Sequence, residues 1–376
     1  MSTTPERCLG KLIKDIDEEI SPNDINSVSK ETAYKTSSEQ KLSLDSIYSF
    51  KSNSSSSSLM SFPMTRSNIL SAFENQHDTI YLQKMLMEAS KETLGKVIKE
   101  ISGIFSMIIK NKNGNYFFSD LYKACNDEQR IIILQELSIT LSYDCMDEYG
   151  THSIQTLIEH SSCEDEYKYI LSSFNDCSKI SNAAKNSNGF YVIQKIINHI
   201  PEIYRMEFNY LFLKLFFDLS LDIYGISTVK AFIFHTKNEE IMDQIWSITY
   251  NNFLVIAKNQ YGNYLIQSML EHWGNSNPGT KLKQMCITHF SELMENHYSK
   301  YICDLFINRA NIEEKKIVLA ILLKNKTNFN VINNKKNNAK EDKSNIKENS
   351  NKEFHNNNFY SPLSNNAKPF YPKKKK

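Results

Sequence analysis

Three side chains in the segment NQYGNYLIQSMLEH, residues 259–272, have types and a spacing that could bind a planar ligand. Asn263 and Gln267 are four residues apart, so they share one face if the segment is helical, and Tyr264 lies beside them. The two amides would offer donors and acceptors to one edge of a flat ring, and the tyrosine would offer a surface for stacking. The group suits a nucleobase, although a helix cap, a half-buried ring and a surface amide would leave the same pattern.

The neighbouring residues predict the helix that must hold these three side chains. Leu265, Ile266, Met269 and Leu270 form an apolar stripe with helical spacing. The helix should begin near Gly262, a residue that would let the chain turn tightly into it. The stripe is expected to be core, and the polar group would lie along its edge.

This arrangement recurs along the chain. When the place of Gln267 is taken as a marker, successive markers lie 36, 36, 39, 36, 37 and 37 residues apart. A period near 37 with helical apolar spacing is typical of an α-solenoid, in which each unit buries its apolar face against its neighbours. Each marked helix is followed by a second amphipathic run and preceded by a short one, so about three helices per repeat are expected. Glycine precedes five of the marked helices, at Gly114, Gly150, Gly189, Gly225 and Gly262.

Each repeat therefore carries a triplet, formed by the first, second and fifth residues of its marked helix. The triplets are Thr79, Ile80 and Gln83; Asn115, Tyr116 and Ser119; Thr151, His152 and Gln155; Phe190, Tyr191 and Gln194; Ile226, Ser227 and Lys230; Asn263, Tyr264 and Gln267; and Lys300, Tyr301 and Asp304. Four triplets end in Gln, and five have Tyr or His in second place. Stacked repeats would align these residues on one surface. A purely structural scaffold has no need to keep an amide and a ring together, whereas proteins that bind one base per repeat need both.

Composition divides the chain into three parts. Residues 1–67 contain the run SFKSNSSSSSLMSF and residues 326–376 are rich in Asn and Lys, so both ends are predicted to be disordered. Residues 68–325 remain for a repeat domain. The formal charge of +1 hides a basic tail, with 13 Lys against four acidic residues over 324–376, and a net acidic middle. That middle argues mildly against nonspecific binding of nucleic acid, which needs clustered Lys and Arg.

Several other classes of protein find no support in the sequence. The seven cysteines form no CxxC pair, and His160 and Cys163 have no second ligand pair, so neither disulfides nor zinc are expected. The most apolar stretch, YLFLKLFFDLSL at 210–221, is too short and too charged to span a bilayer. No signal-peptide pattern and no Walker, GxSxG or Rossmann motif is present. The prediction is a cytoplasmic binding protein without a cofactor, a membrane segment or enzymatic activity.

The repeated motifs resemble those of the Pumilio family of RNA-binding proteins, also called PUF proteins, over residues 68–325. YGNYLIQSMLEH resembles the sixth family repeat, NQHDTIYLQKML the first, YGTHSIQTLIEH the third and NHYSKYICDLFI the seventh. The resemblance implies an all-α fold, a right-handed α-solenoid crescent of three-helix repeats of about 36–39 residues. It implies single-stranded RNA, usually in the 3′ untranslated regions of messages, as the ligand of a monomeric protein. Translation or message stability would then be regulated through recruited deadenylation or translational repression proteins.

Carried over residue by residue, the family code assigns a base to several triplets. Asn263 with Gln267 should read uracil, and Thr151 with Gln155 should accept adenine. The implied edge-reading residues are Asn263, Gln267, Thr151, Gln155, Thr79, Gln83, Asn115 and Gln194. The implied stacking residues are Tyr264, His152, Tyr191, Tyr116 and Tyr301.

The sequence departs from the family pattern in four repeats and at the carboxyl end. Asn115 keeps half of the uracil-reading pair, but Ser119 is too short to complete it. Phe190 stands where a polar edge reader is expected, the triplet that begins at Ile226 matches no standard code, and Lys300, Tyr301 and Asp304 replace a guanine-reading set. An eighth repeat is not recognisable. Two alternatives therefore remain, a degenerate repeat scaffold that binds a protein partner and a nucleolar Pumilio-like factor in ribosome assembly.

Overall fold

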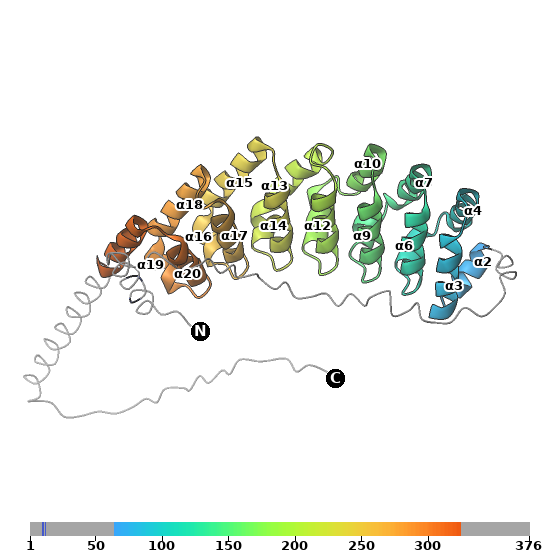
Figure 1. Ribbon diagram of the computed structural model, residues 1–376, viewed down its shortest axis with the longest axis horizontal. Helices are drawn as coiled ribbons and strands as arrows, with labels where there is room; N and C mark the ends of the chain where they lie inside the picture. The colour runs from blue at the N-terminus through green and yellow to red at the C-terminus, as the bar shows by residue number, and fades with distance from the viewer. Residues whose placement is uncertain (1–9, 11, 13–63, 325–376) are drawn as a thin grey trace, which may run out of the picture. The chain divides into compact units, whose positions relative to one another are not determined.

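The computed structural model describes residues 10, 12 and 64–324 (Figure 1). Most of the predicted disordered ends, 1–67 and 326–376, lies outside the described residues. Contacts divide the chain into two units, Met1–Leu319 and Ala320–Lys376. Residues 320–324, the described part of the second unit, are helical, and the rest of this section concerns the first unit.

All regular elements of the described first unit are helices, and most repeats contain three (Figure 1). The first helices are α2 (Arg66–Ala72), α5 (Phe105–Ile109), α8 (Leu141–Asp144), α11 (Cys177–Ala184), α16 (Phe253–Lys258) and α19 (Phe290–Glu295). The second helices, which carry the triplets, are α3 (Gln76–Met87), α6 (Gly114–Ala124), α9 (Gly150–His160), α12 (Gly189–His199), α14 (Gly225–His235), α17 (Asn263–Trp273) and α20 (Lys300–Arg309). The third helices are α4 (Lys91–Ile101), α7 (Asp127–Leu137), α10 (Glu164–Ser172), α13 (Met206–Ser220), α15 (Glu239–Asn251) and α18 (Asn277–Thr288), followed by a helical segment over 312–319. The predicted all-α solenoid is confirmed.

The fifth repeat has no separate first helix. The 15-residue helix α13 serves both as the third helix of the fourth repeat and as the first helix of the fifth. It packs against α11, α14 and α15. The stretch 210–221, which is the most apolar of the sequence, lies largely within this helix, and its side chains Phe212, Phe216 and Leu219 are fully buried. The expected three separate helices are therefore fused here, because the apolar residues continue across the repeat junction.

An Asn or Asp side chain starts the second helix of every repeat. Asn259 Oδ1 accepts hydrogen bonds from the backbone N–H groups of Tyr261 and Gly262, at 2.8 and 2.9 Å. Asp147 likewise accepts from the N–H group of Gly150 at 2.9 Å. These bonds satisfy N–H groups that have no partner within the helix. The seven equivalent residues are Asn75, Asn111, Asp147, Asn186, Asp222, Asn259 and Asn296.

The glycine at the start of the second helix allows two backbone segments to approach closely. A Cβ atom on Gly150 would lie 2.4 Å from the backbone oxygen of Asp144. The tight turn expected from the sequence does not use a left-handed conformation at this glycine, because Gly103 is the described glycine with a positive φ. In the seventh repeat Ser299 takes the glycine position, and its hydroxyl donates to the backbone oxygen of Leu293 at 2.7 Å. Leu293 lies six residues before Ser299, just as Asp144 lies six residues before Gly150. At this position, therefore, serine makes a hydrogen bond to the backbone oxygen that closely approaches the glycine in the other repeat.

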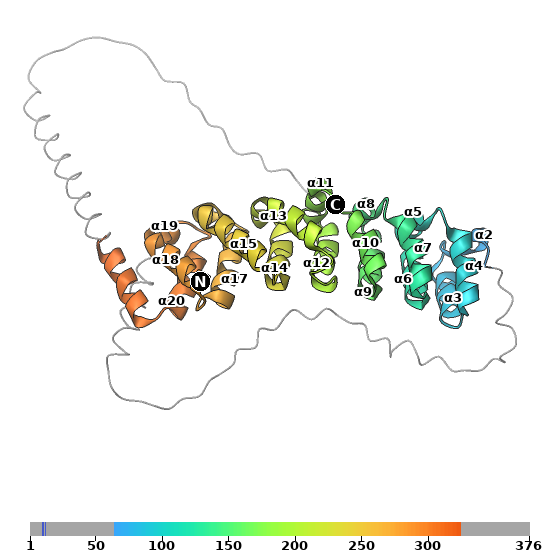
Figure 2. The same cartoon turned by 90° about the horizontal axis from the view of Figure 1, so that it is seen from above.

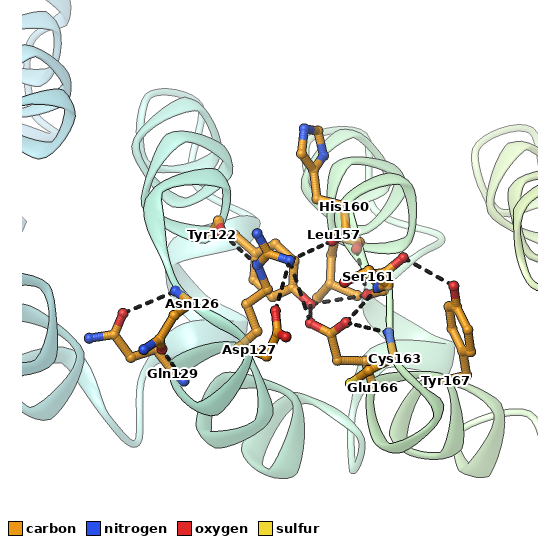
Figure 3. Close-up of polar contacts among 12 residues, drawn as sticks. Tyr122, Asn126, Asp127, Gln129, Leu157, His160, Ser161, Cys163, Glu166 and Tyr167 are labelled. Carbon is orange, nitrogen blue, oxygen red and sulfur yellow. Dashed lines mark hydrogen bonds and ion pairs between the residues drawn. The ribbon is translucent and has the colours of Figure 1, made fainter. Parts of the chain in front are cut away.

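A buried carboxylate links the second and third repeats (Figure 3). Glu166 on α10 is fully buried, and its Oε2 accepts from the N–H groups of Ser162 and Cys163 at 2.6 and 3.2 Å. Its Oε1 accepts from the hydroxyl of Tyr122 on α6 at 3.4 Å and lies 3.8 Å from Nη1 of Arg130 on α7. Burial raises the pKa of the Tyr122 phenol, so this group stays a neutral donor. The contacts join helices of two repeats and so help to set the spacing of their triplets.

Two arginines bind the carboxyl ends of second helices in adjacent repeats. Arg130 donates to the backbone oxygen of Tyr122 at 3.3 Å and to that of His160, at the end of α9, at 2.7 Å. Arg205, which is 1% exposed, donates to the carbonyl after α12 at 3.1 Å and to that of His235, at the end of α14, at 2.7 Å. Burial lowers the pKa of the Arg205 guanidinium from its ordinary value. A cation stabilises these helix ends because their last carbonyl groups carry partial negative charge.

Candidate RNA interface

The triplets lie along one surface of the first unit. Second helices of successive repeats pack against each other from α3 to α20, and they form one row in both views (Figures 1 and 2). Side chains in second place are exposed in six of the seven repeats, and Ser227 is half-buried in the fifth. Exposed fractions are 41% for Ile80, 62% for Tyr116, 49% for Tyr191, 53% for Tyr264 and 47% for Tyr301, and His152 is exposed as well. This row, which we call the triplet surface, presents rings with about half of their area open for stacking.

Residues in first place lie beneath this surface. Thr79, Asn115, Thr151 and Asn263 are only 2–3% exposed. Asn263 donates both hydrogens of its amide to the backbone oxygens of Asn259 and Gln260, at 3.0 and 2.9 Å. The sequence pattern predicted direct contact between these residues and a base edge. In the structure their donors are already bonded to backbone, either in the preceding turn, as for Asn263, or in the next repeat, as for the Thr151 hydroxyl, which donates to the backbone oxygen of Asn188 at 3.0 Å.

The glutamines in third place are half-buried, and the protein orients their amides. Gln267 donates from Nε2 to Oδ1 of Asn263 at 2.7 Å, and Gln155 donates to the hydroxyl of Thr151 at 3.1 Å. Since the amide hydrogens of Asn263 face two carbonyl groups, only its oxygen can face Gln267. The first-place residue thus sets the orientation of the third-place amide in these two repeats.

The other two glutamines are oriented by the next repeat. Gln83 donates from Nε2 to Oδ2 of Asp120 at 2.5 Å, and Gln194 donates to the backbone oxygen of Ser227 at 3.0 Å. A carboxylate oxygen and a backbone oxygen can only accept hydrogen bonds, so the Nε2 group of each glutamine must face its partner. In all four repeats the glutamine keeps its Oε1 and one N–H hydrogen for a ligand. One acceptor beside one donor matches the N3–H and O4 edge of uracil or the N1 and N6 edge of adenine.

The remaining triplets do not have this arrangement. Ser119 donates its hydroxyl hydrogen to the backbone oxygen of Asn115 at 2.8 Å. Ile226 is 7% exposed and so presents little to a ligand, while Lys230 and Asp304 are half-buried. The second, fifth and seventh triplets therefore lack the third-place glutamine amide that the other four have.

Aromatic rings cluster at the fourth and fifth repeats. The ring centroid of Phe190 lies 3.9 Å from that of Tyr191 and 5.4 Å from that of Tyr224, with which it is stacked. Tyr224 precedes the glycine of the fifth repeat, and the same place holds Tyr149 in the third repeat. A hydrogen bond with Glu148 is the main cause that raises the pKa of Tyr149. Sequence reasoning missed this second set of tyrosines, although the recurring pair YG in the motifs marks most of them.

Several charged side chains on the second helices already have partners. Lys195 Nζ lies 3.7 Å from a carboxylate oxygen of Glu159, and Lys123 Nζ lies 3.2 Å from that of Asp120. The Lys300 ammonium lies 5.4 Å from the centroid of the Tyr301 ring. Few of these cations are left for phosphate groups, so binding here would depend on stacking and base edges more than on charge.

A model for the Pumilio-family RNA binding repeat matches residues 105–138, 145–170, 184–207 and 252–276. These segments correspond to the second, third, fourth and sixth repeats. The chain is also 25% identical to a Pumilio domain-containing protein of Schizosaccharomyces pombe over 303 residues, which are 79% of this chain and 44% of that protein. It is 24% identical to Pumilio homolog 12 of Arabidopsis thaliana over 211 residues, 55% of this chain and 35% of the relative. The chain thus spans less than half the length of these relatives.

Solved structures show the same fold. The Puf4 RNA binding domain bound to the HO endonuclease RNA 3′ UTR recognition sequence superposes with a TM-score of 0.59 at 19% identity, covering 68% of this chain and 77% of that one. The RNA-binding domain of yeast Puf5p bound to SMX2 RNA gives 0.58 at 18% identity, covering 66% and 70%. The repeat matches, the relatives and the fold together support a divergent Pumilio-family protein. The repeats that the family model leaves unmatched include the fifth and seventh, whose triplets depart from the common pattern.

Two findings bear on other kinds of site. Among residues 10, 12 and 64–324, no group of three His, Cys, Asp or Glu side chains is placed to hold a metal ion. No helix in that part of the chain combines the length and the apolar character needed to cross a membrane.

Proposed function

We propose that this chain binds single-stranded RNA in a sequence-selective manner through the triplet surface. The observation that carries the proposal is the regular pairing, in four repeats, of a half-buried glutamine with a neighbouring second-place side chain that is exposed, aromatic in three of them. Each pair offers one surface for stacking and one donor–acceptor edge, which is the chemistry of one nucleobase. Because stacking rings and amide edges suit recognition of a ligand, we propose a binding protein and not an enzyme.

The selectivity of each repeat follows from its triplet. Gln267, oriented by Asn263, reads uracil while Tyr264 stacks on it. Gln155, oriented by Thr151, reads adenine beside the ring of His152. Further edge contacts come from Gln83 with Thr79 and from Gln194, and further stacking comes from Tyr116, Tyr191 and Tyr301. The buried first-place residues act mainly by orienting the amides.

The target and the outcome follow from the ligand chemistry together with the relatives. Puf4 is bound to a 3′ UTR recognition sequence in its structure. We therefore propose that the ligand is the 3′ untranslated region of messenger RNA, that the protein acts in the cytoplasm as a monomer, and that it regulates translation or message stability. Proteins of deadenylation or translational repression would be its partners.

Selection of RNA from a random pool by the full chain tests this proposal. The unaltered chain should enrich a defined motif. Gln267→Ala should relax the choice of base at one nucleotide, and Tyr264→Ala should weaken binding by about 1–3 kcal/mol. Gln244→Ala on α15 and Tyr210→Ala on α13, which remove exposed side chains outside the triplet surface, are matched controls and should leave the motif unchanged.

Two outcomes would contradict the proposal. Uniform weakening without a change of preference would indicate binding to the RNA backbone. No enrichment at all would favour a scaffold that binds a protein, which the net acidic middle of the chain would suit.

A further inference from the structure

The polar side chains of the second triplet have no hydrogen left to donate to a base edge. Ser119 has donated its hydroxyl hydrogen to backbone. Asn115 is 2% exposed, and both hydrogens of its amide are bonded to the backbone oxygens of Asn111 and Lys112, at 2.9 and 2.7 Å. Tyr116 nevertheless has 62% of its surface exposed. A base stacked on this ring would find no free donor within the triplet, and one serine oxygen as its half-buried acceptor.

The next residue along α6, Asp120, supplies a polar group at this place. Its Oδ2 accepts from Nε2 of Gln83 in the first triplet at 2.5 Å, and its Oδ1 accepts from Nζ of Lys123 at 3.2 Å. The side chain is 17% exposed. A carboxylate has about four acceptor positions, so these two contacts leave room for two more. Asp120 is thus held from two sides, between the first and second triplets.

A carboxylate in a set orientation discriminates among bases because it can only accept hydrogen bonds. The Watson–Crick edge of guanine has two adjacent donor groups, N1–H and the N2 amino group, which match the two carboxylate oxygens. Adenine and cytosine offer one amino group beside a ring nitrogen that is an acceptor. Uracil offers one N–H between two carbonyl oxygens. Every base except guanine would therefore place a lone pair against the carboxylate.

We propose that Asp120 takes the place of Ser119 as the base-reading residue of the second repeat and selects guanine at one nucleotide. This inference rests on the proposed function, since it names the specificity of one position on the same surface. Gln83 and Lys123 position the carboxylate. Gln83 keeps its own Oε1 and one N–H hydrogen for the neighbouring base.

The test is a comparison of base preference in the full chain and its variants. RNAs from the selected motif are varied at each nucleotide in turn, and the dissociation constants are measured by fluorescence anisotropy. The unaltered chain should prefer guanine at one nucleotide. Asp120→Asn replaces one acceptor by a donor at nearly constant volume and should reduce that preference about tenfold, the size of one lost bidentate contact. Gln83→Leu, which removes the group that orients the carboxylate, should reduce it by a smaller factor.

Loss of a negative charge near RNA raises affinity for any sequence, so a matched control is needed. Glu159→Gln provides it, because Glu159 lies on the second helix α9, is 56% exposed and makes one long ion pair with Lys195. It should raise overall affinity without changing preference at any nucleotide. Circular dichroism of each variant checks that the helices are retained.

The outcomes separate this inference from the proposed function. Selective binding by the unaltered chain, with a guanine preference that falls in Asp120→Asn and not in Glu159→Gln, supports both. Selective binding with the same base profile in Asp120→Asn overturns the assignment of Asp120 alone. Absence of RNA binding by the unaltered chain overturns both.

Discussion

Removal of the buried Glu166 carboxylate should destabilise the second and third repeats far more than removal of an exposed glutamate nearby. Glu166→Ala leaves the N–H groups of Ser162 and Cys163 without their acceptor and takes a partner from Tyr122. Arg130 retains the carbonyl groups that it binds and is 14% exposed, so its charge is partly compensated. The lost acceptor, and not a stranded cation, is therefore the main cost.

The size of the effect follows from these contacts. A buried donor left without a partner costs about 1–3 kcal/mol, and Glu166→Ala removes the acceptor of two part-buried N–H groups, takes one partner from the buried Tyr122 hydroxyl and leaves a cavity. We expect a loss of about 3–5 kcal/mol in the free energy of unfolding, which is also the range for a broken buried ion pair. Glu166→Gln keeps one acceptor oxygen but turns an amino group towards donors, and it should cost about 1–2 kcal/mol, the difference between charged and neutral hydrogen bonds.

Urea denaturation followed by circular dichroism measures the free energy, and hydrogen exchange reports on the site itself. The amides of Ser162 and Cys163 should exchange faster in both variants. Glu164→Ala is the matched control, because Glu164 is on the same helix, is 54% exposed and pairs only on the surface with Lys168 at 2.9 Å. Its expected cost is about 0–1 kcal/mol.

The reasoning would be refuted if Glu166→Ala lost no more stability than Glu164→Ala. Unchanged exchange at Ser162 and Cys163 would refute it as well. Either result would mean that the carboxylate is not what joins these two repeats.

Two further predictions concern stability. Gly150→Ala should lower the free energy of unfolding, measured by urea denaturation, by about 1–3 kcal/mol, because its Cβ would lie 2.4 Å from a backbone oxygen. Gly95→Ala, inside helix α4, should raise it by about 0.5–1 kcal/mol, because the nearest atom to its Cβ is 3.6 Å away. Equal effects of the two substitutions would contradict the close approach at Gly150. Burial raises the pKa of the Cys125, Cys145 and Cys286 thiols from 9.0 to about 12, so the folded state keeps protons that the unfolded chain releases. The free energy of unfolding should therefore fall as the pH rises from 9 to 12, by at most about 1.4 kcal/mol per pH unit for each thiol. Cys286→Ala should make this dependence on pH less steep. A urea midpoint that stays constant from pH 9 to 12 would contradict the prediction.

Local patterns in the sequence were enough to predict the repeat and its helices. The apolar residues Ile154, Leu157 and Ile158 recur with helical spacing, and all three are buried on α9. The exposed second place also followed from the pattern, because a residue next to the apolar stripe of a stacked helix faces outwards. A tight turn at Gly150 was expected from the sequence, whereas the crowding oxygen of Asp144 is visible only in three dimensions.

The sequence by itself determined that seven similar units follow one another and that each carries a ring beside a polar side chain. This was possible because helical periodicity depends on residues within a few positions of each other. Only the tertiary structure decided that Asn263 lies beneath the surface, that α13 serves two repeats, and that Asp120 meets Gln83. The physical reason is that these contacts form between repeats: Gln83 and Asp120 are 37 residues apart in sequence, and only the stacking of α3 on α6 brings an amide to its acceptor.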